Sequence, residues 1–234
     1  MPYQERNVTA IIAAGGRGAR MNAGQPKQFL PLAGKPILAR TLMVFAQCAC
    51  VDEIVIAAPE DWIPFIERNI LAFYGLGKAS ATPGGDTRQR SVYKGLQAAR
   101  GDLILIHDAA RPLITHDDIA ASLEAAVRDG ACAPGVPLMD TVKVRGADGM
   151  ARPAPPRETL WRIQTPQAFA AAVIREAHEN AARDAFEATD DAALVERMGR
   201  PVQIIPGREA NVKITTEDDL LWCEYRLRRG SGVL

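Results

Sequence analysis

The sequence lacks an excess of charge of either sign, which argues against a dedicated nucleic-acid or membrane-surface binder. It has 28 Lys and Arg against 28 Asp and Glu, so its formal net charge is zero. Such binders depend on a cationic field, although a balanced total does not exclude a local cluster of positive groups. No apolar run approaches the ~18 residues of a membrane span, and the polar residues 1–7 are not the start of a signal peptide. We therefore expect a cytoplasmic protein that binds neither nucleic acid nor membranes.

Cysteine is also scarce. The chain has four cysteines, none in a C-x-x-C pair and none with a histidine at zinc-finger spacing: Cys48, Cys50, Cys132 and Cys223. We expect them to be buried or idle thiols in a reducing compartment. Hydrophobic residues make up 47% of the chain and charged residues 24%, which is ordinary for a globular protein and excludes a disordered tail or a collagen-like fibre.

Short apolar runs alternate with amphipathic stretches along the 234 residues. The runs predict buried strands at 8–13, 53–58, 79–82, 102–107 and 202–205. Helices are predicted from about 36, and over about 60–74, 88–100, 116–128, 168–183, 190–198 and from 217. This order favours a single Rossmann-like α/β domain over 1–234, with a mostly parallel twisted sheet and helices on both faces.

The alternation stops between about residues 138 and 162. This stretch contains Pro153, Pro155 and Pro156 and has little helical period. One interpretation is a long exposed loop, and the other is an arm that projects from the domain and acts elsewhere. Long irregular insertions in compact domains are uncommon and usually functional.

A glycine-rich loop, Ala13 to Arg20, directly follows the first strand. It is not a Walker A loop, because no Gly-Lys-Ser/Thr follows, and it is not a dinucleotide fingerprint, because the third glycine is replaced by Met21. The glycines allow a close backbone approach to an anion, and Arg20 and Lys27 suit a triphosphate better than a plain turn. A tight turn with two solvated cations is the alternative interpretation.

Two further segments follow strands or open helices. Asp108 ends the clearest strand, where a carboxylate is well placed to hold Mg²⁺ on a phosphate, or alternatively caps a turn before Arg111. The adjacent His107 is expected to pack or hydrogen-bond locally rather than act as a base. A Pro-Gly-Gly-Asp turn ending at Asp86 leads into a helix with Arg88 and Ser91, whose N-terminus can receive anions or ligand acceptors.

Taken in order, these segments resemble the 2-C-methyl-D-erythritol 4-phosphate cytidylyltransferase family over about residues 8–225. Seven collinear blocks carry the resemblance: the glycine loop with Pro26–Phe29, Gly84–Val92, His107–Pro112, Asp140–Lys143, Leu160–Phe169, Thr189–Ala192 and Gly207–Thr215. Departures are slight, with Gly15 where Ala is common and Asp191 where Glu is common.

The resemblance implies transfer of CMP from CTP to methylerythritol phosphate with release of pyrophosphate, in isoprenoid precursor synthesis with Mg²⁺. It implies that Arg20, Lys27 and Lys213 are catalytic and that Asp108 lies by the metal-bound phosphates. It further implies that the nucleotide is bound by Ala14, Gly15, Gly16, Gly85, Asp86, Ser91, Asp108 and Ala109.

The resemblance also implies a homodimer in which the arm embraces a second subunit. The acceptor would lie among Asp108, Arg111, Thr141, Arg157 and Thr189, with Thr141 and Arg157 delivered by the partner. Some members of the family are fused to a cyclodiphosphate synthase domain. We expect none in this chain, although a separate partner with that domain is compatible with the sequence.

The sequence also bears on three other functions. A cytidylyltransferase for another polyol phosphate, such as ribitol 5-phosphate, would share the nucleotide half of the site. A non-catalytic nucleotide-binding regulator is disfavoured because Arg20, Lys27 and Lys213 are all present. An NAD-dependent oxidoreductase fails because the dinucleotide fingerprint is missing.

Overall fold

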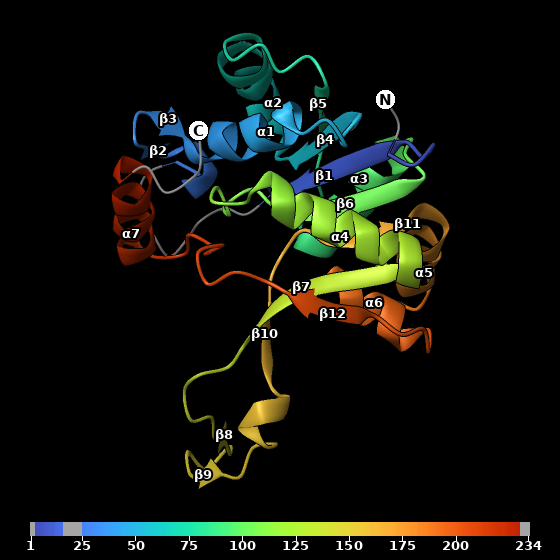
Figure 1. Ribbon diagram of the computed structural model, residues 1–234, viewed down its shortest axis with the longest axis vertical. Helices are drawn as coiled ribbons and strands as arrows, with labels where there is room; N and C mark the ends of the chain where they lie inside the picture. Colours follow the sequence, from blue (N-terminus) through green and yellow to red (C-terminus); the bar gives the residue numbers. More distant parts are fainter. Residues whose placement is uncertain (1–2, 16–24, 230–234) are drawn as a thin grey trace.

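The computed structural model describes residues 3–15 and 25–229, and most of its described strands form one central sheet (Figure 1). The strand order is β10-β7-β11-β6-β1-β4-β5, with β12 also paired to β7. Their bounds are β1 Val8–Ala13, β4 Glu53–Ala58, β5 Ala79–Pro83, β6 Leu103–Asp108, β7 Ala131–Pro137, β10 Trp161–Ile163, β11 Gln167–Ala170 and β12 Gln203–Pro206. A separate small hairpin joins β2 (Pro31–Leu32) to β3 (Lys35–Pro36).

The pairing is mostly parallel, as predicted. Strand β1 runs parallel to β4 and β6, β4 runs parallel to β5, and β12 runs parallel to β7. Strand β11 is antiparallel to β6 and β7, and β10 is antiparallel to β7. The five strands predicted from apolar runs are all present, and β7, β10 and β11 are additional.

The helix predicted to begin at Ala168 is wrong at its start. Residues Gln167–Ala170 form β11, and helix α5 begins only at Ala171. Ala168 and Phe169 are both buried, but they belong to the cores on opposite faces of the sheet. The alanine-rich run is compatible with a helix. It forms a strand instead, because its backbone hydrogen-bonds to β6 on one side and to β7 on the other.

Apolar side chains of the central strands alternate between two cores. On β1, Ala10 and Ile12 join one cluster and Ile11 joins the other. The first face is covered by α1 (Ile37–Gln47), α2 (Ile63–Phe65), the π-helical turn Ile66–Ala72 that continues it, and α4 (His116–Asp129). The second is covered by α3 (Arg88–Ala98), α5 (Ala171–Arg183) and α6 (Asp191–Arg197).

A third, smaller cluster holds the last helix, α7 (Glu217–Arg228). Cys223 of this helix packs with Ile214 and with Ala110, which follows β6. This packing places the chain around residue 213 against the segment that follows β6. No helix among residues 3–15 and 25–229 is long and apolar enough to cross a membrane.

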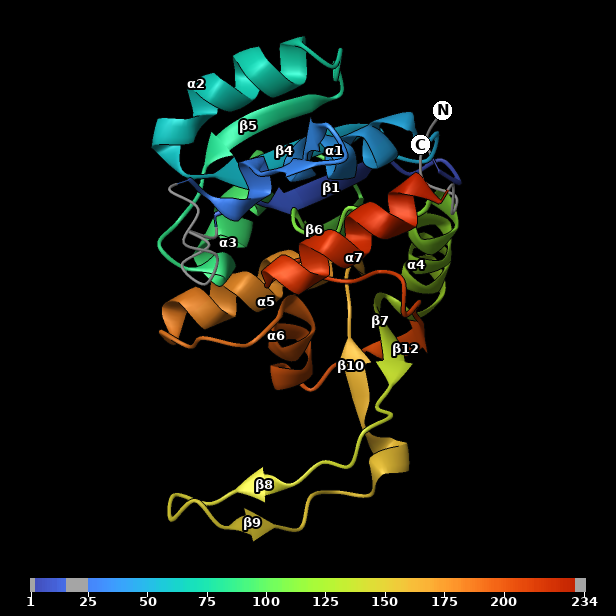
Figure 2. The same cartoon turned by 90° about the vertical axis from the view of Figure 1, so that its left-hand side faces the viewer.

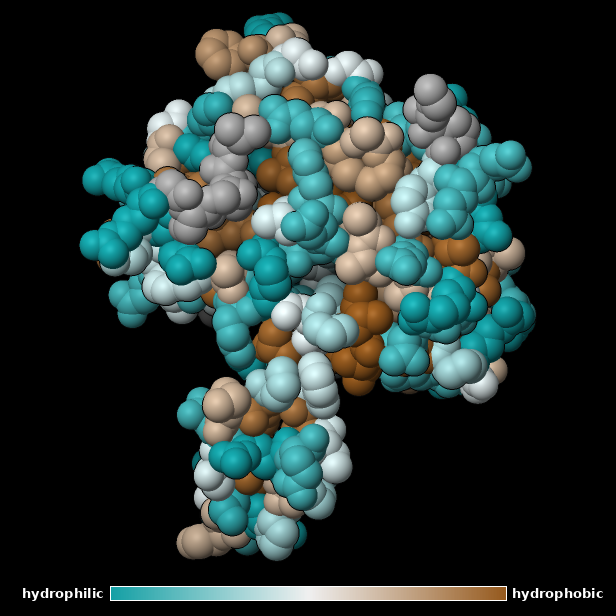
Figure 3. Space-filling view, in the orientation of Figure 1, coloured by the Kyte–Doolittle hydropathy of each residue, from teal (hydrophilic) through white to brown (hydrophobic). Residues whose placement is uncertain are grey.

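The segment between β7 and β10 projects from the body as an arm (Figures 1 and 2). It carries a short hairpin of β8 (Val144–Arg145) and β9 (Ala151–Arg152), followed by a 3-10 turn at Arg157–Thr159. In the space-filling view the arm is a lobe with hydrophobic surface on it and at its base (Figure 3). Large exposed apolar side chains on the arm and its base are Met139, Val142, Val144, Met150, Trp161 and Ile163. The segment therefore projects from the body, and its action elsewhere stays a prediction.

Candidate active site

The carboxyl ends of β1 and β6 bring the start of the glycine loop, at Ala13, next to Asp108. In the register of these two parallel strands Ala13 lies opposite Asp108. The Ala109 backbone N–H then donates to the Ala13 carbonyl at 3.2 Å. Ligands bind at this edge of open parallel sheets, so the sheet itself places the predicted carboxylate beside the predicted phosphate loop.

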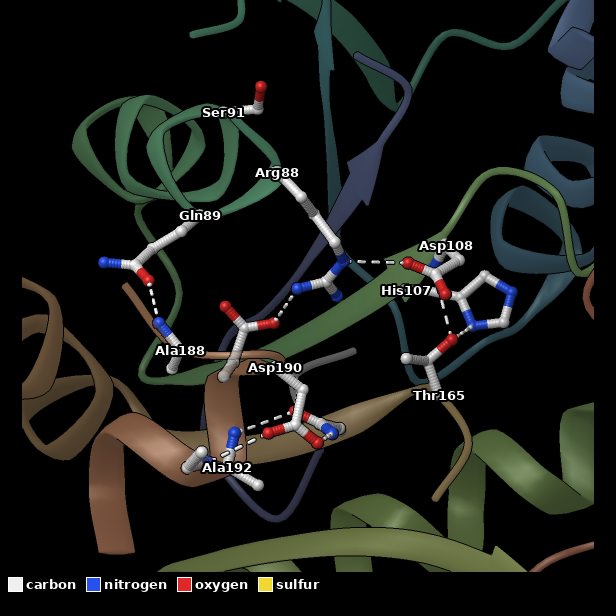
Figure 4. Close-up of polar contacts among 12 residues, drawn as sticks. Arg88, Gln89, Ser91, His107, Asp108, Thr165, Ala188, Asp190 and Ala192 are labelled. Carbon is white, nitrogen blue, oxygen red and sulfur yellow. Dashed lines mark hydrogen bonds and ion pairs between the residues drawn. The ribbon is translucent and has the colours of Figure 1, made fainter. Parts of the chain in front are cut away.

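Asp108 is buried and surrounded by three cations. Its Oδ1 lies 3.0 Å from Arg88 Nε, and its Oδ2 lies 2.9 Å from Lys213 Nζ and 3.6 Å from Arg111 Nε. Figure 4 shows Arg88 reaching from α3 to Asp108 at the end of β6. Burial alone would raise the pKa of the Asp108 carboxyl, but attraction to Arg88, Lys213 and Arg111 outweighs it and holds this pKa well below its usual range. Asp108 is therefore ionised near neutral pH.

Arg88 bridges Asp108 to a second buried carboxylate, Asp191. Its Nη1 lies 2.7 Å from Asp191 Oδ2, and the other oxygen of Asp191 lies 3.1 Å from His178 Nε2. The Asp191 side chain is only 1% exposed, so its charge depends on these partners. The sequence predicted no catalytic or binding role for Arg88, Asp191 or His178, although Arg88 and Asp191 each lie inside one of the seven blocks.

Lys27 lies beside the segment that carries Lys213. Its Nζ donates to the Ile214 carbonyl at 2.7 Å, and the neighbouring Gln28 side chain donates to the Ala14 carbonyl at 2.6 Å. Two cations that are far apart in the sequence are thereby brought to one end of the sheet. The Ile214 N–H also donates to the Ala110 carbonyl at 2.8 Å, which fixes this segment against the end of β6.

The turn before α3 and Ser91 lie close to Gly15, at the start of the glycine loop. Thr87 caps the helix by accepting from the Arg90 N–H, and the buried Ser91 hydroxyl accepts from the Gly85 N–H at 3.0 Å. A Cβ added at Gly15 would lie 2.8 Å from Ser91 Oγ, which shows how closely the two segments approach. Asp86 is exposed and pairs with Arg90 at 2.7 Å.

His107 is a buried structural residue, as expected. It is 0% exposed, and burial lowers its pKa to about 4. The Thr165 hydroxyl accepts from the Asp108 N–H at 3.1 Å and lies 3.0 Å from His107 Nδ1, while His107 Nε2 lies 3.1 Å from the Arg111 carbonyl. A neutral ring that donates from Nε2 and accepts at Nδ1 satisfies all these contacts. Thr165 and His107 together therefore fix the backbone on either side of Asp108 (Figure 4).

Three predicted acceptor-binding residues are exposed at the surface of the chain. Thr141 and Arg157 are exposed on the arm, and Arg157 Nη1 donates to the Met139 carbonyl at 3.0 Å. Thr189 is exposed in the segment before α6. This segment is fixed by Gln89, which accepts from the Ala188 N–H, and by Gln167, which donates to Asp190 (Figure 4). Arg111 joins the Asp108 cluster, and Ala14 and Ala109 lie beside it, whereas Arg20 and Gly16 lie outside the described residues.

Among the described residues, no group of three or more His, Cys, Asp or Glu side chains is placed to hold a metal ion. The cluster contains one ionised carboxylate, Asp108, that faces three cations. Mg²⁺ is commonly held by one or two carboxylates plus the phosphates of a substrate. The donor set therefore fits a Mg²⁺ that arrives with a nucleotide better than a dedicated protein-bound ion.

A mostly parallel α/β sheet with a glycine loop and a cation-rich carboxylate at its strand ends defines a nucleotide-handling enzyme. The family model for IspD, 2-C-methyl-D-erythritol 4-phosphate cytidylyltransferase, matches residues 8–229. A relative of that name from Geobacter metallireducens is 47% identical over 223 residues, which is 93% of this chain and 96% of the relative. A relative of the same name from Geobacillus kaustophilus is 45% identical, over 93% of this chain and 96% of the relative.

Solved structures agree with the sequence comparisons. The crystal structure of 2-C-methyl-D-erythritol 4-phosphate cytidylyltransferase from Thermus thermophilus is 37% identical, with a TM-score of 0.80 over 95% of this chain and 99% of that one. The 4-diphosphocytidyl-2C-methyl-D-erythritol synthase from Anaerococcus prevotii is 30% identical, with a TM-score of 0.85 over 96% and 97%. The chain belongs to the 2-C-methyl-D-erythritol 4-phosphate cytidylyltransferase family, and it is a nucleotidyltransferase.

Proposed function

We propose that this chain transfers CMP from CTP to 2-C-methyl-D-erythritol 4-phosphate, giving 4-diphosphocytidyl-2-C-methyl-D-erythritol and pyrophosphate for isoprenoid synthesis in the cytoplasm. The observation that carries the proposal is the convergence of Arg88, Arg111 and Lys213 on Asp108, beside the glycine loop and Lys27. Family membership supplies the substrates.

The chemistry needs cations more than a nucleophilic side chain. The attacking group is a phosphate monoester, whose second pKa is about 6, so it is largely ionised at neutral pH. The barrier lies in bringing this dianion up to the anionic α-phosphate of CTP. Charge neutralisation and in-line positioning by fixed cations lower that barrier. Lys27 and Lys213 supply such charge here, and Arg20 of the glycine loop is proposed to join them.

Lys213 changes partner when the triphosphate binds. Its ammonium group lies 2.9 Å from Asp108, and its side chain is 38% exposed. It can therefore turn from Asp108 to a phosphate without being drawn out of the core. Arg88 and Arg111 continue to neutralise Asp108 after this exchange, so the carboxylate is not left buried without a counter-charge.

The nucleotide lies between the glycine loop and the start of α3. We assign phosphate contacts to Ala14, Gly15 and Gly16 and base contacts to Gly85, Asp86 and Ser91. Asp108 and Ala109 lie by the ribose and the phosphates. Ser91 supports this assignment, because its buried hydroxyl orders the Gly85 backbone close to Gly15.

Mg²⁺ accompanies CTP in this proposal, and Asp108 holds it. When bound, the ion neutralises triphosphate charge and polarises the phosphate that is attacked. Asp108 suits this task because Arg88 and Arg111 each lower the pKa of its carboxyl, and both remain beside it when Lys213 departs.

The arm completes the acceptor site of a second subunit. In one chain Thr141 and Arg157 are exposed on the arm, whereas Arg111 and Asp108 lie at the sheet edge. The arm also exposes Met150 at 66% and Met139 at 73%, apolar surface that a homodimer would cover. We propose that Arg157 of one protomer binds the acceptor phosphate in the site of its partner.

The activity is tested by measuring pyrophosphate release from each of the four nucleoside triphosphates with Mg²⁺ and methylerythritol phosphate. Release only with CTP supports the proposal. Ribitol 5-phosphate in place of methylerythritol phosphate tests the other polyol acceptor, and release with neither acceptor contradicts an enzymatic role. Lys27→Ala and Lys213→Ala should each lower kcat strongly, because each variant loses ~2–4 kcal/mol of transition-state stabilisation. Arg197→Ala, an exposed arginine of α6, is the control and should turn over normally.

The composite site is tested by mixing two inactive variants, Lys27→Ala and Arg157→Ala. A mixed dimer contains one site that is intact in both respects, so activity should return on mixing. No return of activity, in mixtures shown by mass to contain the mixed dimer, contradicts the shared site but leaves the single-chain chemistry untouched.

A further inference from the structure

Two of the four cysteines lie together, away from the candidate active site. Cys48 and Cys50 flank Ala49 in the connection between α1 and β4, and their sulfur atoms are 2.8 Å apart. Both are free thiols. A disulfide bond is about 2.05 Å long, so roughly 0.8 Å of approach would join them.

The backbone holds this connection in a turn that presents both sulfurs on one side. The Cys48 N–H ends α1 by donating to the Val44 carbonyl at 3.1 Å, and the Val51 N–H donates back to the Cys48 carbonyl at 3.2 Å. Asp52 then accepts from the Val8 N–H at 2.9 Å, which anchors the turn to β1. The thiols are therefore near each other because of the fold.

The charges around the pair favour one thiolate. The hydrogen bond from Cys50 lowers the pKa of the Cys48 thiol to about 6, and the same bond raises that of Cys50. The carboxyl end of a helix opposes a negative charge, but the neighbouring His116 of α4 and Lys78 near β5 act to lower the pKa of Cys48. Asp52 and Tyr3 are the other titratable groups that face Cys50. One proton is then shared between two sulfurs at neutral pH.

The other two cysteines have the opposite surroundings. Cys132 on β7 and Cys223 on α7 are both 0% exposed, and burial raises the pKa of each thiol to about 12. Thiols of this kind are inert toward exchange, because the thiolate is the reactive species. The expectation of buried or idle thiols thus fits Cys132 and Cys223, and Cys48 is also a buried free thiol.

We propose that Cys48 and Cys50 are a redox-active thiol pair, which closes to an intramolecular disulfide on contact with a low-molecular-weight disulfide such as oxidised glutathione. Cys50 is the more exposed of the two, so it meets the reagent. When Cys48 takes up the proton of Cys50, the Cys50 sulfur becomes a thiolate, attacks one sulfur of the reagent and displaces the other as a thiolate.

Cys48 then loses its proton to water and attacks the Cys50 sulfur, which releases the second thiol of the reagent. In total the two cysteines lose two electrons and the one proton that they share, and the reagent disulfide becomes two thiols by taking up those electrons, this proton and one further proton from water. No further oxidant is needed. The arm lies at the other end of the molecule from α1 and β4 (Figures 1 and 2).

The test uses the full-length reduced chain and oxidised glutathione. After blocking and unfolding, two of the four thiols should be lost, with no glutathione retained and a mass lower by about 2 Da. Dithiothreitol should restore all four. In Cys48→Ser the second attack is impossible, so glutathione should remain attached to Cys50. Cys132→Ser is the matched control and should close its disulfide as the wild type does.

Three results would overturn the proposal. They are four free thiols after treatment, a stable glutathione adduct on the wild-type protein, or the same loss of mass in Cys48→Ser. None depends on turnover, so the outcome is independent of the proposed cytidylyltransferase activity.

Discussion

Removing Arg88 should destabilise the fold because it leaves a buried carboxylate poorly compensated. Arg88 lies 2.7 Å from Asp191, whose side chain is 1% exposed, and 3.0 Å from Asp108. Breaking a buried ion pair by deleting one partner costs about 3–5 kcal/mol. The Arg88 side chain is 29% exposed, so the lower end applies. We expect Arg88→Ala to lower the free energy of unfolding by about 3 kcal/mol, which corresponds to a decrease in Tm of about 6–12 °C.

The loss should depend on pH in a defined direction. Burial would raise the pKa of Asp191, but Arg88 and His178 outweigh burial and lower it. A carboxyl with a lowered folded-state pKa stabilises the fold above its unfolded pKa, near 3.9, and loses that contribution as the pH falls. The difference between wild type and Arg88→Ala should be full at pH 7 and shrink below about pH 4. Urea unfolding at several pH values measures it.

A double-mutant cycle separates the ion pair from simple loss of packing. If the cost arises from the uncompensated charge of Asp191, Asp191→Asn should recover about 1–3 kcal/mol in the Arg88→Ala background. Arg90→Ala, which breaks an exposed pair on the same helix, is the control and should leave the unfolding midpoint unchanged. A stability of Arg88→Ala within about 1 kcal/mol of wild type, or strictly additive effects, would refute this reasoning.

Two other substitutions probe the support of the site and of the sheet. Thr165→Val removes the hydroxyl that accepts from the Asp108 N–H, so it should cost about 1–3 kcal/mol of stability in urea unfolding. Thr165→Ser keeps a hydroxyl and should restore most of this stability. Equal losses in both variants would contradict this role. Gly101→Ala puts a Cβ 2.6 Å from the Thr9 backbone nitrogen and should cost about 1–3 kcal/mol. Gly77→Ala, where nothing lies within 4 Å, should cost nothing, and a similar Tm loss in both would mean that crowding is not the cause.

The central part of the fold was predictable because its strands are short, continuous apolar runs. Strands β1, β4 and β6 are buried on both faces, and they were found within about a residue. Strand β7 was missed because Pro134 and Gly135, residues typical of turns, lie inside it. Strand β11 was missed because its alanines and Phe169 are equally suited to a helix. Both strands depend on partners that are distant in the sequence.

The candidate site was predictable in part for the same reason. The position of Asp108 follows from the end of a strand, and its proximity to the glycine loop follows from the parallel sheet. The link from Arg88 to Asp191 spans 103 positions and joins two helices, and no local pattern encodes it. The three cations around Asp108 were individually visible, but only the packing of α7 and the loop after β6 shows that Lys213 and Arg111 meet there.

The way the arm returns to the body links its direction to the candidate site. Strand β10 pairs with β7 and leads, through Gln164, Thr165 and Pro166, into β11 between β6 and β7. Thr165 in this short link holds the Asp108 backbone of the same chain. In the proposed homodimer, a subunit that binds the arm would therefore contact a segment that continues directly to Thr165, the residue that positions Asp108. Quaternary assembly and alignment of the reacting phosphates would then share one covalent path.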